Sequence, residues 1–161
     1  MKTLYLLRHS DAQSSGPGGD LTRDLTTKGH SNAQALADYW KSKEYKADSV
    51  RCSSAVRALN TFEPLRPVVG TSVIDVSRDY YDIDEQEILR YLRSNPADHS
   101  TVLHIGHNPG IAYTAMGLLK DPPEGMLLGY PPCGLTVITF DVDNWSDIDW
   151  KSGVCVDFWR P

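Results

Sequence analysis

The chain has 161 residues, 40% of them hydrophobic, and 21 acidic against 16 basic residues give a net charge of −5. This length suits one domain with its own core, so we predict a single domain over residues 1–161. No basic block, no apolar run of about 20 residues and no targeting segment is visible, which argues against nucleic-acid and membrane partners and predicts a cytoplasmic protein. The cysteines are odd in number and far apart, which indicates free thiols: Cys52, Cys133 and Cys155.

The first predicted element is a short apolar strand, Leu4–Leu7, that ends at four polar residues: Arg8, His9, Ser10 and Asp11. A continuous apolar run is typical of a strand that is buried on both faces. The carboxyl ends of strands in open α/β sheets border the crevice where ligands bind, so Arg8 and His9 are candidate functional residues. The glycine-rich loop 13–20 lacks the spacing of a dinucleotide fingerprint, and no nucleotide cofactor is expected.

Helices and strands alternate through the first two thirds of the chain. Apolar periodicity predicts a helix that begins near Thr26 or Thr27 and buries Trp40, followed by helices from about residue 55 to Pro64, over 85–92 and over 111–119. Further strands are predicted at 48–54, 73–76 and 101–106, and period-two segments at 135–142 and 154–158 predict antiparallel strands.

This alternation predicts an α/β fold: a three-layer αβα sandwich with a mostly parallel central sheet and antiparallel C-terminal strands. In such a sheet the carboxyl ends of the parallel strands meet at one edge. The residues that follow these strands are Arg8 with His9, Ser53 and Ser54 with Arg57, and His107. Two arginines and two histidines are therefore expected to converge.

Two arginines and two histidines suit phosphoryl transfer. The planar forks of Arg8 and Arg57 would clamp the phosphoryl oxygens and neutralise charge in the transition state. A neutral imidazole can attack phosphorus, so we predict that His9 forms a phosphohistidine that water then hydrolyses. His107 would donate from the opposite side, helped by the backbone N–H of Asn108 near a helix N-terminus. This chemistry requires no metal and no cofactor.

Four motifs in order carry a resemblance to a known family: Arg8-His9-Ser-Asp, Leu25-Thr-x-x-Gly29, Ser53-Ser-x-x-Arg57-Ala-x-x-Thr61 and Gly106-His107-Asn108-Pro-Gly. They resemble the histidine phosphatase superfamily, also called the phosphoglycerate mutase-like fold, over essentially the whole chain. The short length, without an inserted helical subdomain, resembles its SixA-type phosphohistidine phosphatase branch. The resemblance implies a phosphate pocket of Arg8, His9, Arg57 and His107, with His9 as the nucleophile.

The chain departs from the family pattern at two points. The residue after the Arg-His pair is most often Gly, whereas this chain has Ser10, whose hydroxyl either contacts the phosphate or fits the turn. The larger branches have a conspicuous glutamate as general acid, whereas the candidates here are Asp11 and Asp82, and a role as solvated loop carboxylates stays open for both.

The weakly defined acid bears on the substrate. An alkoxide needs a positioned proton donor to leave, whereas the imidazole of a phosphohistidine can leave already protonated. We therefore predict a phosphorylated protein, such as a phosphohistidine carrier domain, as the partner. The alternative within the enzyme class is a phosphatase for small phosphomonoesters.

Three other readings remain alternatives. Cys52 with Arg57 suggests a cysteine phosphatase, but that loop needs five intervening residues and this one has four, so Cys52 is expected to be buried. The spacings His9-x-Asp11 and His104-x-x-His107 would allow a metal site. However, His104 lies in a strand and is expected to be a histidine with satisfied hydrogen bonds, either in the core or behind the residues that line the site. A non-catalytic phosphoprotein binder would need the arginines without His9.

Overall fold

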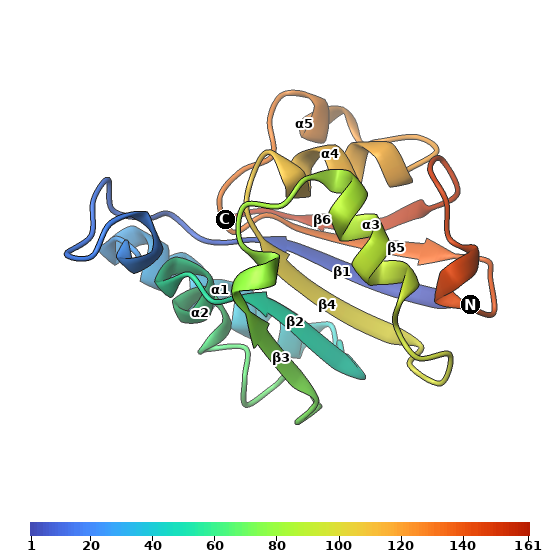
Figure 1. Cartoon of the computed structure of the whole chain (residues 1–161), viewed down its shortest axis with the longest axis horizontal. Coiled ribbons are helices and arrows are strands. Elements are labelled where there is room, and N and C mark those ends of the chain that lie inside the picture. The colour runs from blue at the N-terminus through green and yellow to red at the C-terminus, as the bar shows by residue number, and fades with distance from the viewer.

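The computed structural model describes residues 1–161 and contains one six-stranded sheet with the strand order β3-β2-β4-β1-β5-β6 (Figure 1). The strands are β1 (Lys2–Arg8), β2 (Ser49–Ser53), β3 (Ile74–Ser77), β4 (Thr101–Gly106), β5 (Leu135–Phe140) and β6 (Val154–Trp159). The helices are α1 (Thr27–Ser42), α2 (Val56–Phe62), α3 (Glu85–Arg93), α4 (Gly110–Leu118) and α5 (Glu124–Leu127).

The sheet is parallel from β3 to β1 and antiparallel from β1 to β6, as the sequence predicts. The pairing register decides which residues meet at its edge. Arg8 is paired with Gly106, so the next residues, His9 and His107, leave adjacent strands side by side. Cys52 is paired with Ile105 on the other side of β4, which brings Ser53 to the same edge.

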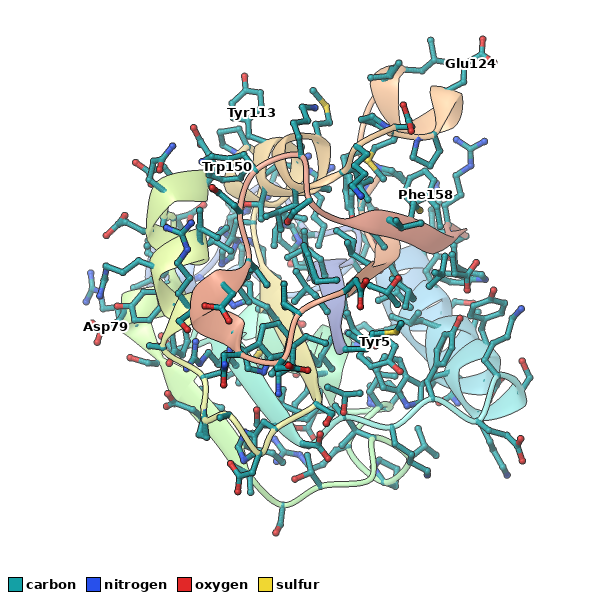
Figure 2. All side chains as sticks on the ribbon, turned by 90° about the vertical axis from the view of Figure 1, so that its right-hand side faces the viewer. Tyr5, Asp79, Tyr113, Glu124, Trp150 and Phe158 are labelled. Carbon is teal, nitrogen blue, oxygen red and sulfur yellow. The ribbon has the colours of Figure 1, made fainter.

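Helices cover both faces of the sheet, which confirms the predicted three-layer arrangement. Alternate residues of β1 point to opposite faces: Tyr5 and Leu7 pack with α1 and α2, and Leu4 and Leu6 pack with α3 and α4. Figure 2 shows the two layers at either side of the strands, with Tyr5 on the α1 side. Two separate hydrophobic cores hold the sheet edge in place, so the polar residues at the strand ends rest on a rigid base.

Two features differ from the predicted elements. The short helix α5 lies in a proline-rich segment that carries no helical periodicity, and three 3-10 helices cover residues 20–22, 78–80 and 145–147. Such short turns depend on local caps and tertiary contacts rather than on an apolar stripe, so periodicity does not reveal them. No helix in the structure combines the length and the apolar character needed to cross a membrane.

Candidate active site

His9 lies at the end of β1 and is held in one tautomer by the backbone. Its Nδ1 is 2.7 Å from the carbonyl oxygen of Ser10, which can only accept a hydrogen bond. Nδ1 therefore carries the proton, and Nε2 keeps its lone pair. Burial lowers the pKa of His9 to about 4, and the charges of Arg57 and Arg8 act in the same direction. The ring is thus a neutral base and nucleophile at pH 7.

His107 faces His9 from the end of β4, with 5.1 Å between the ring centroids. Its Nε2 lies 2.7 Å from the hydroxyl oxygen of Ser53, which also accepts the N–H of Ala55 at 3.2 Å. Because the Ser53 oxygen already accepts one hydrogen bond, we assign the Ser53 hydroxyl as the donor to His107 Nε2. Nε2 is then the unprotonated nitrogen of the neutral ring, and Nδ1 carries the proton. Burial lowers the pKa of His107 to about 3, so this ring is a neutral hydrogen-bond donor.

The two arginines approach the histidines from different segments. Arg57, on α2, is 5% exposed and donates from Nη1 to the carbonyl oxygen of Asp20 at 2.7 Å and from Nη2 to its carboxylate at 3.0 Å. Arg8 donates from Nη1 to the carbonyl oxygen of Tyr130 at 2.8 Å. The Nε atoms of both arginines and Nδ1 of His107 are buried without a partner in the protein. These donors suit an anion.

The four predicted residues line one pocket of about 430 Å³. Its full lining consists of Arg8, His9, Asp20, Arg23, Arg57, Tyr81, Asp82, His107 and Asn108. The buried side chains of His9, Arg57 and His107 form what we term the floor of the pocket. The outer side chains of Asp20, Arg23, Tyr81 and Asp82 form what we term the rim. Asn108 also donates from its side chain to the Tyr130 carbonyl at 3.1 Å.

Two predicted site residues do not reach this pocket. Ser10 is fully buried, and its hydroxyl donates to the carbonyl oxygen of Gly29 at 2.8 Å, so the expectation that it binds phosphate is wrong and the turn-fitting alternative describes it. Asp11 turns the other way, because its carboxylate accepts a 2.6 Å hydrogen bond from Thr26 at the start of α1. Asp11 is therefore not placed to protonate a leaving group, whereas Asp82 lines the pocket.

The structure also bears on the metal-site and cysteine-phosphatase alternatives. His104 is a core histidine, as expected, and lies buried against the ring of Tyr80. Both of its nitrogens lack a partner in the protein, so the expectation of satisfied hydrogen bonds is wrong. No three His, Cys, Asp or Glu side chains are grouped as metal ligands would be. Cys52 is fully buried, and burial raises the pKa of its thiol to about 12, so it is an inert thiol.

Three lining residues are absent from the sequence-based set: Asp20, Arg23 and Tyr81. Asp20 accepts hydrogen bonds from both Arg23, at 2.9 Å, and the Tyr81 hydroxyl. The Tyr81 ring meets the ring of His107 edge-on at 5.3 Å. Asp20 begins the 3-10 helix at residues 20–22, and Arg23 and Tyr81 directly follow the 3-10 helices at residues 20–22 and 78–80, so neither periodicity nor a strand end marks them.

Known proteins resemble this chain in sequence and in structure. The family described as the histidine phosphatase superfamily (branch 1) matches residues 4–79, and no curated protein matches significantly. A candidate phosphohistidine phosphatase SixA from Nakamurella multipartitia has a TM-score of 0.85 and 27% identity over 99% of this chain and 96% of its own.

Two further SixA structures show the same fold. The candidate phosphohistidine phosphatase SixA from Agrobacterium tumefaciens has a TM-score of 0.81 and 24% identity, covering 99% of each chain. A protein histidine phosphatase SixA complexed with tungstate has a TM-score of 0.78 and 22% identity, covering 97% of this chain and 95% of its own.

The family match over residues 4–79 and the shared fold make the chain similar to the histidine phosphatase superfamily. This similarity supports a phosphatase, a hydrolase that removes phosphoryl groups. Each of the three SixA structures matches nearly the whole chain.

Proposed function

We propose that this chain is a metal-independent phosphatase that works through a phosphohistidine on His9 and removes phosphoryl groups from phosphohistidine on a protein. The observation that carries the proposal is the orientation of His9. Its Nδ1 is bound to the Ser10 carbonyl at 2.7 Å, so the lone pair of Nε2 is available at the floor of a pocket lined by two arginines.

The reaction has two steps. His9 Nε2 attacks phosphorus, an N–P bond forms, and the bond from phosphorus to the leaving group breaks with its electron pair going to that group. Arg8, Arg57 and the Nδ1–H of His107 bind the equatorial oxygens as charge builds on them. Water then attacks phosphorus of the phosphoenzyme, the N–P bond breaks, and inorganic phosphate and free His9 result. The Ser10 carbonyl holds the His9 Nδ1–H and stabilises the ring while it carries positive charge.

A phosphohistidine substrate fits the position of the acid candidates. Asp11 is engaged with Thr26, and the remaining candidate, Asp82, is exposed at the rim. An imidazole that leaves protonated needs little help from such a group, whereas an alkoxide needs a donor within hydrogen-bond reach. The tungstate bound by a SixA structure of this fold is itself a tetrahedral oxyanion, which agrees with a phosphoryl site.

The second candidate is a phosphatase for small phosphomonoesters, with Asp82 as general acid. The observation that favours it is that Asp82 lines the pocket beside Tyr81, with a volume of about 430 Å³ available to a small ester. A cytoplasmic location and a single domain over residues 1–161 remain predictions.

The test is phosphoryl transfer to the enzyme. The protein is mixed with a radiolabelled phosphohistidine protein and quenched in alkali, in which phosphohistidine is stable. We expect label on wild type and on His30→Ala, a control whose side chain is 52% exposed, and none on His9→Ala. Binding of the phosphoprotein without label or turnover would instead indicate a phosphoprotein-binding module. Turnover no faster than on a panel of phosphate esters would favour the second candidate.

A further inference from the structure

The pocket has a layered charge distribution that the proposed phosphatase activity does not by itself require. The floor holds the neutral rings of His9 and His107 and the buried cation of Arg57. The rim holds two carboxylates, of Asp20 and Asp82, and one further cation. A phosphoryl dianion balances Arg8 and Arg57, which leaves the rim with an excess of negative charge.

The geometry of the reaction directs the leaving group toward this rim. Nucleophile and leaving group lie on opposite sides of phosphorus in an in-line displacement. His9 attacks from the floor, where its side chain is buried, so the leaving group departs toward the open side of the pocket. The atoms attached to the phosphoryl group therefore pass the carboxylate of Asp20, whose side chain is 48% exposed.

Asp20 is fixed as an anion at this position. Its carboxylate accepts from Arg57 at 3.0 Å, from Arg23 at 2.9 Å and from the hydroxyl of Tyr81, which joins the loop after β1 to the turn after β3. Hydrogen bonds from Tyr81 and Arg23 hold the pKa of Asp20 well below its usual range. Asp20 takes the Nη1–Nη2 end of the Arg57 fork, and the unpartnered Nε side remains for the phosphoryl oxygens.

We propose that Asp20 is a specificity-determining residue that selects substrates by the charge of the leaving group. Its carboxylate favours a neutral or cationic leaving group, such as the imidazole of a phosphohistidine, and disfavours phosphoesters with a second anionic group beside the phosphoryl group. The inference rests on the proposed phosphatase function and names the residue behind its substrate preference. In the absence of the Asp20 charge, Arg23 lacks its partner and attracts an anionic leaving group instead.

The test compares three aryl phosphates that carry groups of different charge at the para position: an aminomethyl cation, a neutral hydroxymethyl group and a carboxymethyl anion. The ratio of kcat/KM for the cationic over the anionic substrate is measured for wild type and Asp20→Asn, a variant that keeps the shape and an acceptor oxygen. Dividing one ratio by the other cancels the intrinsic reactivity of the substrates. Asp79→Asn is the matched control, since the Asp79 side chain is exposed (Figure 2) and Asp79 is not one of the pocket-lining residues.

For one half-exposed charge we expect the cation preference to fall by about threefold to tenfold in Asp20→Asn and to stay unchanged in Asp79→Asn. The wild-type preference should also weaken as salt rises from about 0.02 to about 0.5 M, because exposed charges are screened. An unchanged ratio in Asp20→Asn overturns the proposal. Binding of the matching benzylphosphonates, measured by calorimetry, gives the same comparison without turnover. An unchanged ratio in Asp20→Asn with normal labelling of His9 rejects only the role of Asp20, whereas absence of label on His9 rejects the proposed function.

Discussion

Gly29, in the first turn of α1, packs directly against the loop that follows β1 and carries His9. A methyl group on its Cα would lie 2.0 Å from the carbonyl oxygen of Asp11 and 3.0 Å from its carbonyl carbon. The same contact contains the 2.8 Å hydrogen bond from the Ser10 hydroxyl to the Gly29 carbonyl and the 3.0 Å bond from the Thr26 N–H to the Asp11 carbonyl. A side chain at residue 29 must therefore push the helix and the loop apart.

We expect Gly29→Ala to lower the free energy of unfolding. Overpacking against backbone costs about 1–3 kcal/mol, and each weakened hydrogen bond adds about 1 kcal/mol. The better helix propensity of Ala returns about 1 kcal/mol, so with the two hydrogen bonds weakened the net loss is roughly 2–4 kcal/mol. Activity should fall as well, because the displaced segment includes the Ser10 carbonyl that holds His9.

Urea unfolding followed by circular dichroism measures this loss, with kcat/KM measured on the same samples. The matched control is Gly125→Ala in α5, where the added methyl group would meet only the flexible end of Arg160, at 3.3 Å. The control should be neutral or slightly stabilised. A Gly29→Ala protein as stable and as active as wild type would refute the packing argument.

Four further predictions concern the pocket and the core. Arg57→Lys keeps the charge but loses the fork, so steady-state kinetics should show kcat/KM reduced by about 10²–10³-fold, close to the loss in Arg57→Ala. Since burial lowers the pKa of His9 to about 4, the acid limb of the pH–rate profile for kcat/KM should lie near pH 4 rather than near the usual value of about 6.5. Burial lowers the pKa of His104 to about 3, so between this value and the unfolded pKa of about 6.5 the unfolded state binds more protons and the free energy of unfolding falls as pH falls. His104→Leu should reduce this pH dependence, measured by urea unfolding at pH 7 and about pH 4.5. The substitution should cost little stability at pH 7, because both ring nitrogens lack partners. If Asp82 is the general acid, Asp82→Asn should slow esters with poor leaving groups at least about tenfold more than those with good ones, whereas equal slowing would remove Asp82 from that role.

The sequence predicts the scaffold because the scaffold rests on periodic burial. The strand Leu4–Leu7 and the stripe that contains Trp40 carry their apolar pattern in neighbouring residues, and both lie in the core. The meeting of His9 with His107 follows from the strand ends once the order of the parallel strands is known. These features depend on local pattern and on one rule of sheet geometry.

The rim of the pocket is less accessible to such reasoning. The contact between Asp20 and Tyr81 joins residues 61 positions apart in two irregular segments, and no repeat or motif relates them. The orientation of Ser10 depends on Gly29, whose missing side chain allows its carbonyl to approach the hydroxyl. Side-chain direction in tight turns is set by such single contacts, and composition does not encode them.

The two clamp arginines differ in what anchors them, and the difference has an evolutionary side. Arg8 is tied to a main-chain oxygen of Tyr130, which every amino acid supplies, so point mutation at residue 130 leaves that anchor chemically intact. Arg57 is tied in part to the side chain of Asp20, which a single codon change can remove. The position of Arg8 is therefore tolerant of side-chain mutation at its anchor. The position of Arg57 can be changed by mutation of Asp20, so selection can act on it.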